Sequence, residues 1–96
     1  MMKLKKNILL IEVAEDLGID PEIIVEFISY QWITPMDQQA RYLDEEDVAR
    51  IGLIRDLKEN FGVNDEAIPI ILHLIDQLNH LHNQFLDNDS NNEKNN

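Results

Sequence analysis

The four letters "GIDP" constrain the fold more than any other part of this 96-residue sequence. The apolar residues Val13 and Leu17, four positions apart, predict a short helix. This helix is expected to end at Gly18, because glycine adopts the left-handed conformation of a helix end without steric strain. Asp20 is a favourable N-cap, and Pro21 suits a first helical position, where a missing N–H costs nothing. Two helices joined by so short a connection predict a helix-turn-helix unit.

Apolar spacing and turn residues predict the elements on either side of this turn. "KNILLI" favours a short strand before the first helix. Pro35 disfavours helix at the preceding residue, so "WITP" is predicted to be extended, and "MDQQARYL" predicts the tip and return strand of a hairpin, or wing. The second helix is expected from Pro21 to about Gln31, with a core-facing side made of Ile23, Ile24, Phe27 and Ile28.

A third helix is predicted after the wing. Asp44 is its expected N-cap, and Asp47 three residues later is expected to complete a capping box. The helix is predicted to continue to about Asn60, and Gly62 to end it. Its apolar stripe, at spacings of three and four, consists of Val48, Ile51, Ile54, Leu57 and Phe61.

A longer fourth helix is expected over residues 64–86, with Asn64 as its cap and Pro69 in its first turn. Two apolar stripes run side by side along this helix, and the second becomes polar half-way along it, whereas the main stripe continues. This predicts that the first half of the helix packs on its own domain. The second half is then a heptad seam for another helix; an apolar face buried wholly within the domain is the alternative. Residues 1–86 are predicted to form one domain and residues 87–96 a disordered polar tail. The main stripe consists of Ala67, Ile71, Leu74, Leu78, Leu81 and Phe85.

Charge limits the partners that the chain can take. Asp and Glu number 19 against eight Lys and Arg, the formal net charge is −11, and residues 7–40 contain no Lys or Arg. Affinity for nucleic acids depends on cations that neutralise phosphates, so direct nucleic-acid binding is not expected. An acidic protein instead attracts basic partners. Solubility alone is the other interpretation of the same charge.

The sequence lacks the patterns typical of catalytic and metal sites. Without cysteine it can form neither disulfides nor thiolate sites. No signal peptide and no apolar run of the roughly 20 residues that span a bilayer are found, so a cytoplasmic protein without membrane contact is expected. His73, Asp76 and His80 share one side of the fourth helix, but nothing identifiable completes a metal site around them. We therefore expect no enzyme activity, no cofactor and no metal.

Two stretches resemble the MerR-type winged helix: "VAEDLGIDPEIIVEFISYQWITP" and "RYLDEEDVARIGLIRDLKENFGVNDEAIPIILHLIDQL". The features that carry the resemblance are the helix end "LGI", the turn "ITP", the segment "LDEEDVARI" and the long last helix, over roughly residues 10–85. The small size, the missing arginines and "AIPIILHLIDQLNHL" are most similar to the chaperone-modulator family, CbpM. The expected fold is mostly α, a MerR-like winged helix-turn-helix with a long C-terminal helix. Two departures are the missing hydroxyl cap before the first helix and the Asn-rich end, where longer relatives continue a charged helix.

The resemblance implies a regulator that needs neither catalysis nor cofactor. Chaperone modulators bind the J-domain of a curved-DNA-binding, DnaJ-type co-chaperone and inhibit its co-chaperone and DNA-binding activities. J-domains present a basic helix, which an acidic protein would attract. The alternatives are a MerR-family DNA-binding transcriptional regulator and an adaptor or antitoxin-like module with another basic partner.

No family motif fixes the contact residues, so the candidates follow from charge and residue type alone. Tyr30 and Trp32 either lock the wing to the core or anchor a partner, a role in which aromatic residues are enriched. The candidates for binding the partner are Glu12, Glu15, Asp16, Glu22, Glu26, Tyr30 and Trp32. A homodimer is expected through a seam made of Ile71, Leu74, Leu78, Leu81 and Phe85.

Overall fold

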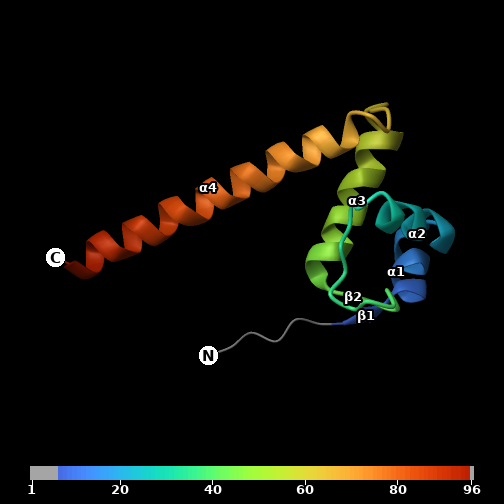
Figure 1. The fold of residues 1–96 in the computed structure, drawn as a ribbon, viewed down its shortest axis with the longest axis horizontal. Helices are drawn as coiled ribbons and strands as arrows, with labels where there is room; N and C mark the ends of the chain where they lie inside the picture. Colours follow the sequence, from blue (N-terminus) through green and yellow to red (C-terminus); the bar gives the residue numbers. More distant parts are fainter. Residues whose placement is uncertain (1–6, 96) are drawn as a thin grey trace. The chain divides into compact units, whose positions relative to one another are not determined.

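The computed structural model describes the backbone of residues 7–95 and the side chains of residues 7–86. Two compact units divide the chain after Asn64. None of the helices in the described part has the length and hydropathy that crossing a membrane requires. The fold is mostly helical with a long C-terminal helix, as predicted, and it contains a small two-stranded sheet. Its elements are β1 (Ile8–Leu9), α1 (Leu10–Leu17), α2 (Pro21–Ser29), β2 (Tyr42–Leu43), α3 (Glu45–Glu59) and α4 (Ile68–Asn95) (Figure 1).

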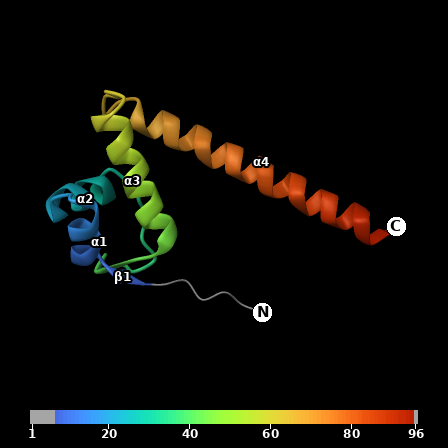
Figure 2. The same cartoon turned by 180° about the vertical axis from the view of Figure 1, so that it is seen from behind.

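The predicted helix-turn-helix is confirmed. Gly18 follows α1 in the left-handed conformation, with φ 67° and ψ 35°. The carboxylate of Asp20 accepts a hydrogen bond from the Glu22 N–H at 2.9 Å, and Pro21 is the first residue of α2. α2 ends before the predicted Gln31, because Gln31 itself has φ 64°, which no α-helix accommodates. α1 and α2 lie together along one side of α3 (Figures 1 and 2).

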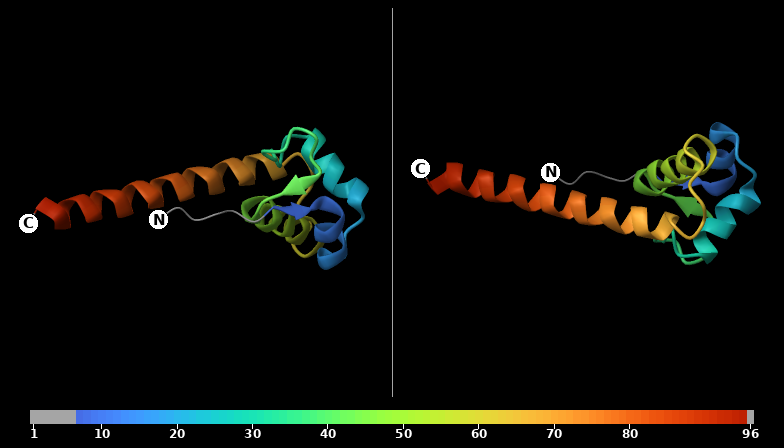
Figure 3. Two further views of the ribbon diagram at one scale, coloured as in Figure 1. Left: turned by 90° about the horizontal axis from the view of Figure 1, so that it is seen from below. Right: turned by 90° about the horizontal axis from the view of Figure 1, so that it is seen from above.

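The wing is built differently from the prediction. Its return strand β2 is present, but it pairs antiparallel with β1, so that Ile8 faces Leu43 and Leu9 faces Tyr42 (Figure 3). "WITP" forms no strand in the described structure. Pro35 has no N–H to donate to a ladder, which is a physical reason for the choice of β1 as the partner.

A reciprocal pair of hydrogen bonds begins α3, as predicted. The Asp44 carboxylate accepts from the Asp47 N–H at 2.9 Å, and the Asp47 carboxylate accepts from the Asp44 N–H at 3.0 Å. Both side chains are buried. This capping box satisfies two backbone donors that a helix start otherwise leaves without partners.

The core of the first unit lies between the three helices and the two-stranded sheet. Two residues predicted to face it do not: the side chain of Ile23 is 40% exposed and that of Phe61 is 73% exposed. α2 instead buries Ile24 and Phe27, and Phe61 lies beyond the last residue of α3, Glu59. The buried apolar residues of this unit are Leu10, Val13, Ala14, Ile24, Phe27, Trp32, Ile33, Leu43, Ile51 and Ile54.

α4 begins at Ile68, four residues after the predicted cap Asn64. A regular helix that started at Asn64 would need a bond from the nitrogen of Pro69 to the Asp65 carbonyl, which proline cannot donate. Residues 65–67 form a turn instead, and Pro69 occupies the second helical position. The predicted tail, residues 87–96, overlaps α4, but its side chains and Asn96 lie outside the described residues, so its disorder stays a prediction.

We predict that Asp44→Ala lowers the free energy of unfolding by about 1–2 kcal/mol, because it removes the acceptor for the Asp47 N–H. Urea denaturation followed by circular dichroism measures the change. The matched control is Glu45→Ala, an exposed residue in the same first turn, which is expected to cost less than about 0.5 kcal/mol. Equal losses in the two variants would contradict a stabilising role for the capping box.

The pH dependence of stability should depend on Asp47. Burial raises the pKa of Asp47 above its ordinary value of 3.8; the Asp44 N–H acts against this, and the neighbouring carboxylates of Asp44 and Glu46 act with it. The folded protein therefore holds this proton more tightly than the unfolded chain. The stabilisation is complete below the unfolded pKa and is lost as pH rises through the raised folded pKa.

Asp47→Asn keeps an oxygen acceptor but never acquires the charge. We predict that its free energy of unfolding, relative to the unchanged protein, increases between pH 3.5 and pH 7. Denaturation curves of both proteins at these two pH values measure the difference. A difference that stays constant between the two pH values would show that the carboxyl is not perturbed.

Candidate partner-binding surface

α2 presents an outward side that is acidic and apolar. Glu22, Val25, Glu26 and Ser29 follow one another at helical spacing, and all four side chains are exposed. The Ser29 hydroxyl donates to the Glu26 carbonyl at 2.7 Å, which leaves the two carboxylates and the Val25 side chain as the main groups on this side. The helix in the position where a helix-turn-helix reads DNA therefore carries no cation.

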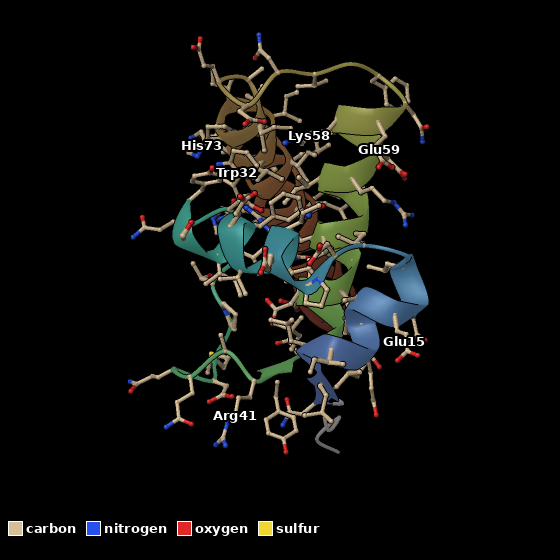
Figure 4. The ribbon with its side chains drawn as sticks, turned by 90° about the vertical axis from the view of Figure 1, so that its right-hand side faces the viewer. Glu15, Trp32, Arg41, Lys58, Glu59 and His73 are labelled. Atoms are coloured by element: carbon tan, nitrogen blue, oxygen red, sulfur yellow. The ribbon has the colours of Figure 1, made fainter. Side chains whose placement is uncertain are left out.

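α1 adds three of the predicted carboxylates. Glu12, Glu15 and Asp16 are all exposed, and Glu15 points outward from α1 in Figure 4. The exposed Ile11 lies four residues before Glu15, on the same side of the helix. The structure thus leaves all five predicted acidic candidates accessible, on two helices of one unit. We call this set the acidic surface; it comprises Glu12, Glu15, Asp16, Glu22 and Glu26.

The two aromatic candidates have different surroundings. Trp32 is only 7% exposed, and its ring lies 5.5 Å from the ring of Phe27 and 4.9 Å from that of Tyr30. The Lys58 ammonium lies 5.8 Å from the Trp32 ring, within the range of a cation–π interaction. Tyr30 is 51% exposed. Trp32 therefore joins the end of α2 to the core, and Tyr30 is the aromatic side chain that a partner can reach.

Three cations of α3 make contacts inside the unit, which sequence reasoning did not foresee. Arg50 Nε donates to the Trp32 carbonyl at 2.6 Å, and Arg55 Nη1 donates to the carbonyl of the last residue of α1. Lys58 lies over the aromatic rings, as Figure 4 shows for Trp32. The signal was available: Arg50 and Arg55 each adjoin a buried isoleucine in the sequence, which places them at the margin of the buried face.

Arg41 is the exposed cation of the side chains that the structure describes. It lies in the wing, away from Glu15 (Figure 4). The Asp37 carboxylate shapes this loop by accepting hydrogen bonds from the backbone N–H groups of Gln39, Arg41 and Tyr42 at 2.9–3.2 Å. Burial alone would raise the pKa of Asp37, but these three donors and the charge of Arg41 outweigh it and lower the pKa. A single exposed arginine next to an ionised carboxylate is a poor phosphate-binding site.

The predicted seam lies on α4. Leu74, Leu78, Leu81 and Phe85 are each more than half exposed, and Ile71 is partly buried. They recur at spacings of three and four on one side of the helix. Exposed apolar side chains in such a row are typical of a helix that pairs with another. The dimer itself stays a prediction.

Polar groups elsewhere in the described structure are accounted for. No three His, Asp or Glu side chains among them are placed to hold a metal ion. Every buried side-chain nitrogen or oxygen within the same residues has a hydrogen-bond partner. The exposed carboxylates of α1 and α2, with apolar side chains between them, remain the candidate surface.

The domain architecture agrees with one comparison to known proteins. No curated protein and no solved structure matches the chain. The model of the family described as "MerR HTH family regulatory protein" matches residues 8–87, which covers both helices of the helix-turn-helix, the wing, α3 and most of α4. The chain therefore belongs to the MerR HTH regulatory family.

Proposed function

We propose that this protein is a chaperone modulator of the CbpM type, which acts in the cytoplasm. It binds the J-domain of a curved-DNA-binding, DnaJ-type co-chaperone and inhibits the co-chaperone and DNA-binding activities of that protein. The observation that carries the proposal is the acidic, cation-free outer side of α2. The sequence resemblance to chaperone modulators and the MerR helix-turn-helix support it.

Electrostatics favour a basic protein over DNA as the partner. A DNA reader needs Arg, Lys, Asn or Gln on its recognition helix and cations along the phosphates. α2 offers Glu22 and Glu26 there, and Arg50, Arg55 and Lys58 of α3 already make contacts within the unit. A basic helix of a J-domain complements the same surface, which speeds the encounter and orients the partner.

Family membership favours a second candidate, a DNA-binding transcriptional regulator. Arg41 in the wing is the cation that such a function would use. This candidate predicts that the protein retards a DNA duplex at low salt and that the retardation disappears steeply as salt rises. An adaptor or antitoxin-like module with another basic partner shares the acidic surface but would not bind a J-domain.

We also propose that two copies associate through α4. In this acidic chain, Asp76 is the only Asp, Glu, Lys or Arg between Ala67 and Leu86. Two copies can therefore bring their seams together with little repulsion between fixed charges. Burial of the exposed leucines and of Phe85 provides the driving force.

The binding prediction compares two pairs of charge-neutralising substitutions. Glu22→Gln with Glu26→Gln should weaken J-domain binding on the order of 2- to 30-fold, because an exposed ion pair is worth about 0.2–1 kcal/mol. Titration calorimetry with the J-domain of a curved-DNA-binding co-chaperone from the same genome measures this at two salt concentrations. The binding affinity of this double variant should also depend less on salt than that of the unchanged protein.

The matched control is Glu45→Gln with Glu66→Gln, which changes the net charge equally at two exposed residues outside α1 and α2. We expect its affinity to stay within about twofold of the unchanged protein. If the unchanged protein does not bind the J-domain at tens of micromolar, the proposed function is wrong. Retardation of a duplex would then favour the transcriptional regulator.

Leu78→Asp should convert the dimer to a monomer, because it places a charge in the middle of an apolar seam. Light scattering coupled to size exclusion measures the mass. The neighbouring Asn79→Asp adds the same charge on the polar side of α4 and should leave the dimer intact. A Leu78→Asp protein that remains dimeric would contradict the seam.

A further inference from the structure

A hollow of about 170 Å³ opens between the α1–α2 turn, one side of α2 and the last turns of α3. Its apolar lining comes from Ile19, Ile23 and Phe27. Phe27 is buried, but Ile23 keeps 40% of its surface exposed although the sequence predicts it to face the core. An incompletely covered isoleucine beside a hollow marks a place where a further apolar group would be accommodated.

The cations that line the hollow are part of its wall. The Arg55 guanidinium donates to the Leu17 carbonyl, and its Nε lies 3.7 Å from Oδ1 of Asp56. The Lys58 ammonium lies 6.0 Å from the centre of the Phe27 ring, and Lys58 is one of the residues that line the hollow. Both charges therefore have partners inside the unit.

The exposed charges at the rim are acidic. Asp20, the N-cap of α2, lines one side, and Glu59, the last residue of α3, lines the other. Both side chains are exposed. Lys58 and Glu59 lie at the same end of α3 in Figure 4. The mouth thus combines apolar side chains and two partly buried cations, which have partners inside the unit, with two exposed carboxylates. It lies next to the outer side of α2, because Ile23 is adjacent in sequence to Glu22.

The size of the hollow fits one side chain. A cavity of about 150 Å³ with an apolar lining accommodates a benzene molecule, so 170 Å³ accommodates one leucine, methionine or phenylalanine side chain. Helices that dock on a surface commonly insert such an anchor into a pocket and surround it with charged contacts. The two exposed carboxylates at the mouth then favour Lys or Arg beside the anchor.

We propose that this hollow receives a single apolar side chain from the basic helix of the J-domain partner, with flanking cations of that helix facing Asp20 and Glu59. The inference rests on the proposed function and adds to it the anchor that the acidic surface alone lacks. In this proposal the acidic surface attracts the basic partner, and the hollow fixes the position of the partner's helix on the protein.

The test compares two apolar truncations, one at the hollow and one outside α1 and α2, that leave the net charge unchanged. Ile23→Ala removes the side chain that borders the hollow and should weaken J-domain binding about fivefold or more, with the salt dependence preserved. Met36→Ala removes the same number of side-chain heavy atoms, three, from an 88% exposed residue of the wing and should weaken binding by less than about twofold. Calorimetry measures both affinities, and thermal unfolding checks that both variants are folded.

A second comparison tests the rim. Glu59→Gln should weaken binding about two- to threefold at low salt and reduce its salt dependence, whereas Glu45→Gln at the other end of α3 should do neither. If the unchanged protein binds but Ile23→Ala and Met36→Ala weaken binding equally, the hollow is not the anchor site and the proposed function stands. If the unchanged protein does not bind, both proposals are wrong. If Ile23→Ala changes the mass of the protein without any J-domain, a second copy occupies the hollow, which overturns the inference.

Discussion

The organisation of the first unit depends on the contacts that the cations of α3 make with the helix-turn-helix. The last carbonyls of a helix lack partners within it and carry partial negative charge. Arg55 donates to the carbonyl of Leu17 at the end of α1, Arg50 donates to the carbonyl of Trp32 after α2, and Lys58 lies over the rings of Phe27 and Trp32. One helix thereby contacts the C-terminal ends of both helices of the helix-turn-helix.

These contacts have a consequence for function. In a chain with eight basic residues, Arg50, Arg55 and Lys58 are only partly exposed and make contacts inside the unit. The outer sides of α1 and α2 are correspondingly acidic, with exposed Ile11, Val25 and Tyr30 among the carboxylates. A helix-turn-helix that binds DNA presents a basic helix to the groove. Here the same geometry presents the acidic helix α2, which is compatible with a basic protein partner.

Local chemistry made much of the fold predictable. The left-handed Gly18, the Asp20 cap with Pro21, and the Asp44–Asp47 capping box all depend on residues within a few positions of one another, so their patterns can be recognised without knowledge of the tertiary fold. Where the prediction failed, a backbone constraint or a distant partner intervened. Gln31 in the left-handed conformation shortened α2, Pro69 delayed the start of α4, and β2 paired with a strand more than thirty residues earlier.

The sequence by itself determined the helix-turn-helix, the capped third helix, the excess of negative charge and the acidic residues of α1 and α2, because these follow from composition and short-range spacing. Only the tertiary structure decided which side chains of α2 are covered, since burial depends on α3 and on the turn that pack against it. It therefore placed Trp32 in the core and left Ile23 at the mouth of a hollow. The tertiary structure also decided which carbonyl groups Arg50 and Arg55 donate to, because these acceptors lie 18 and 38 residues away along the chain.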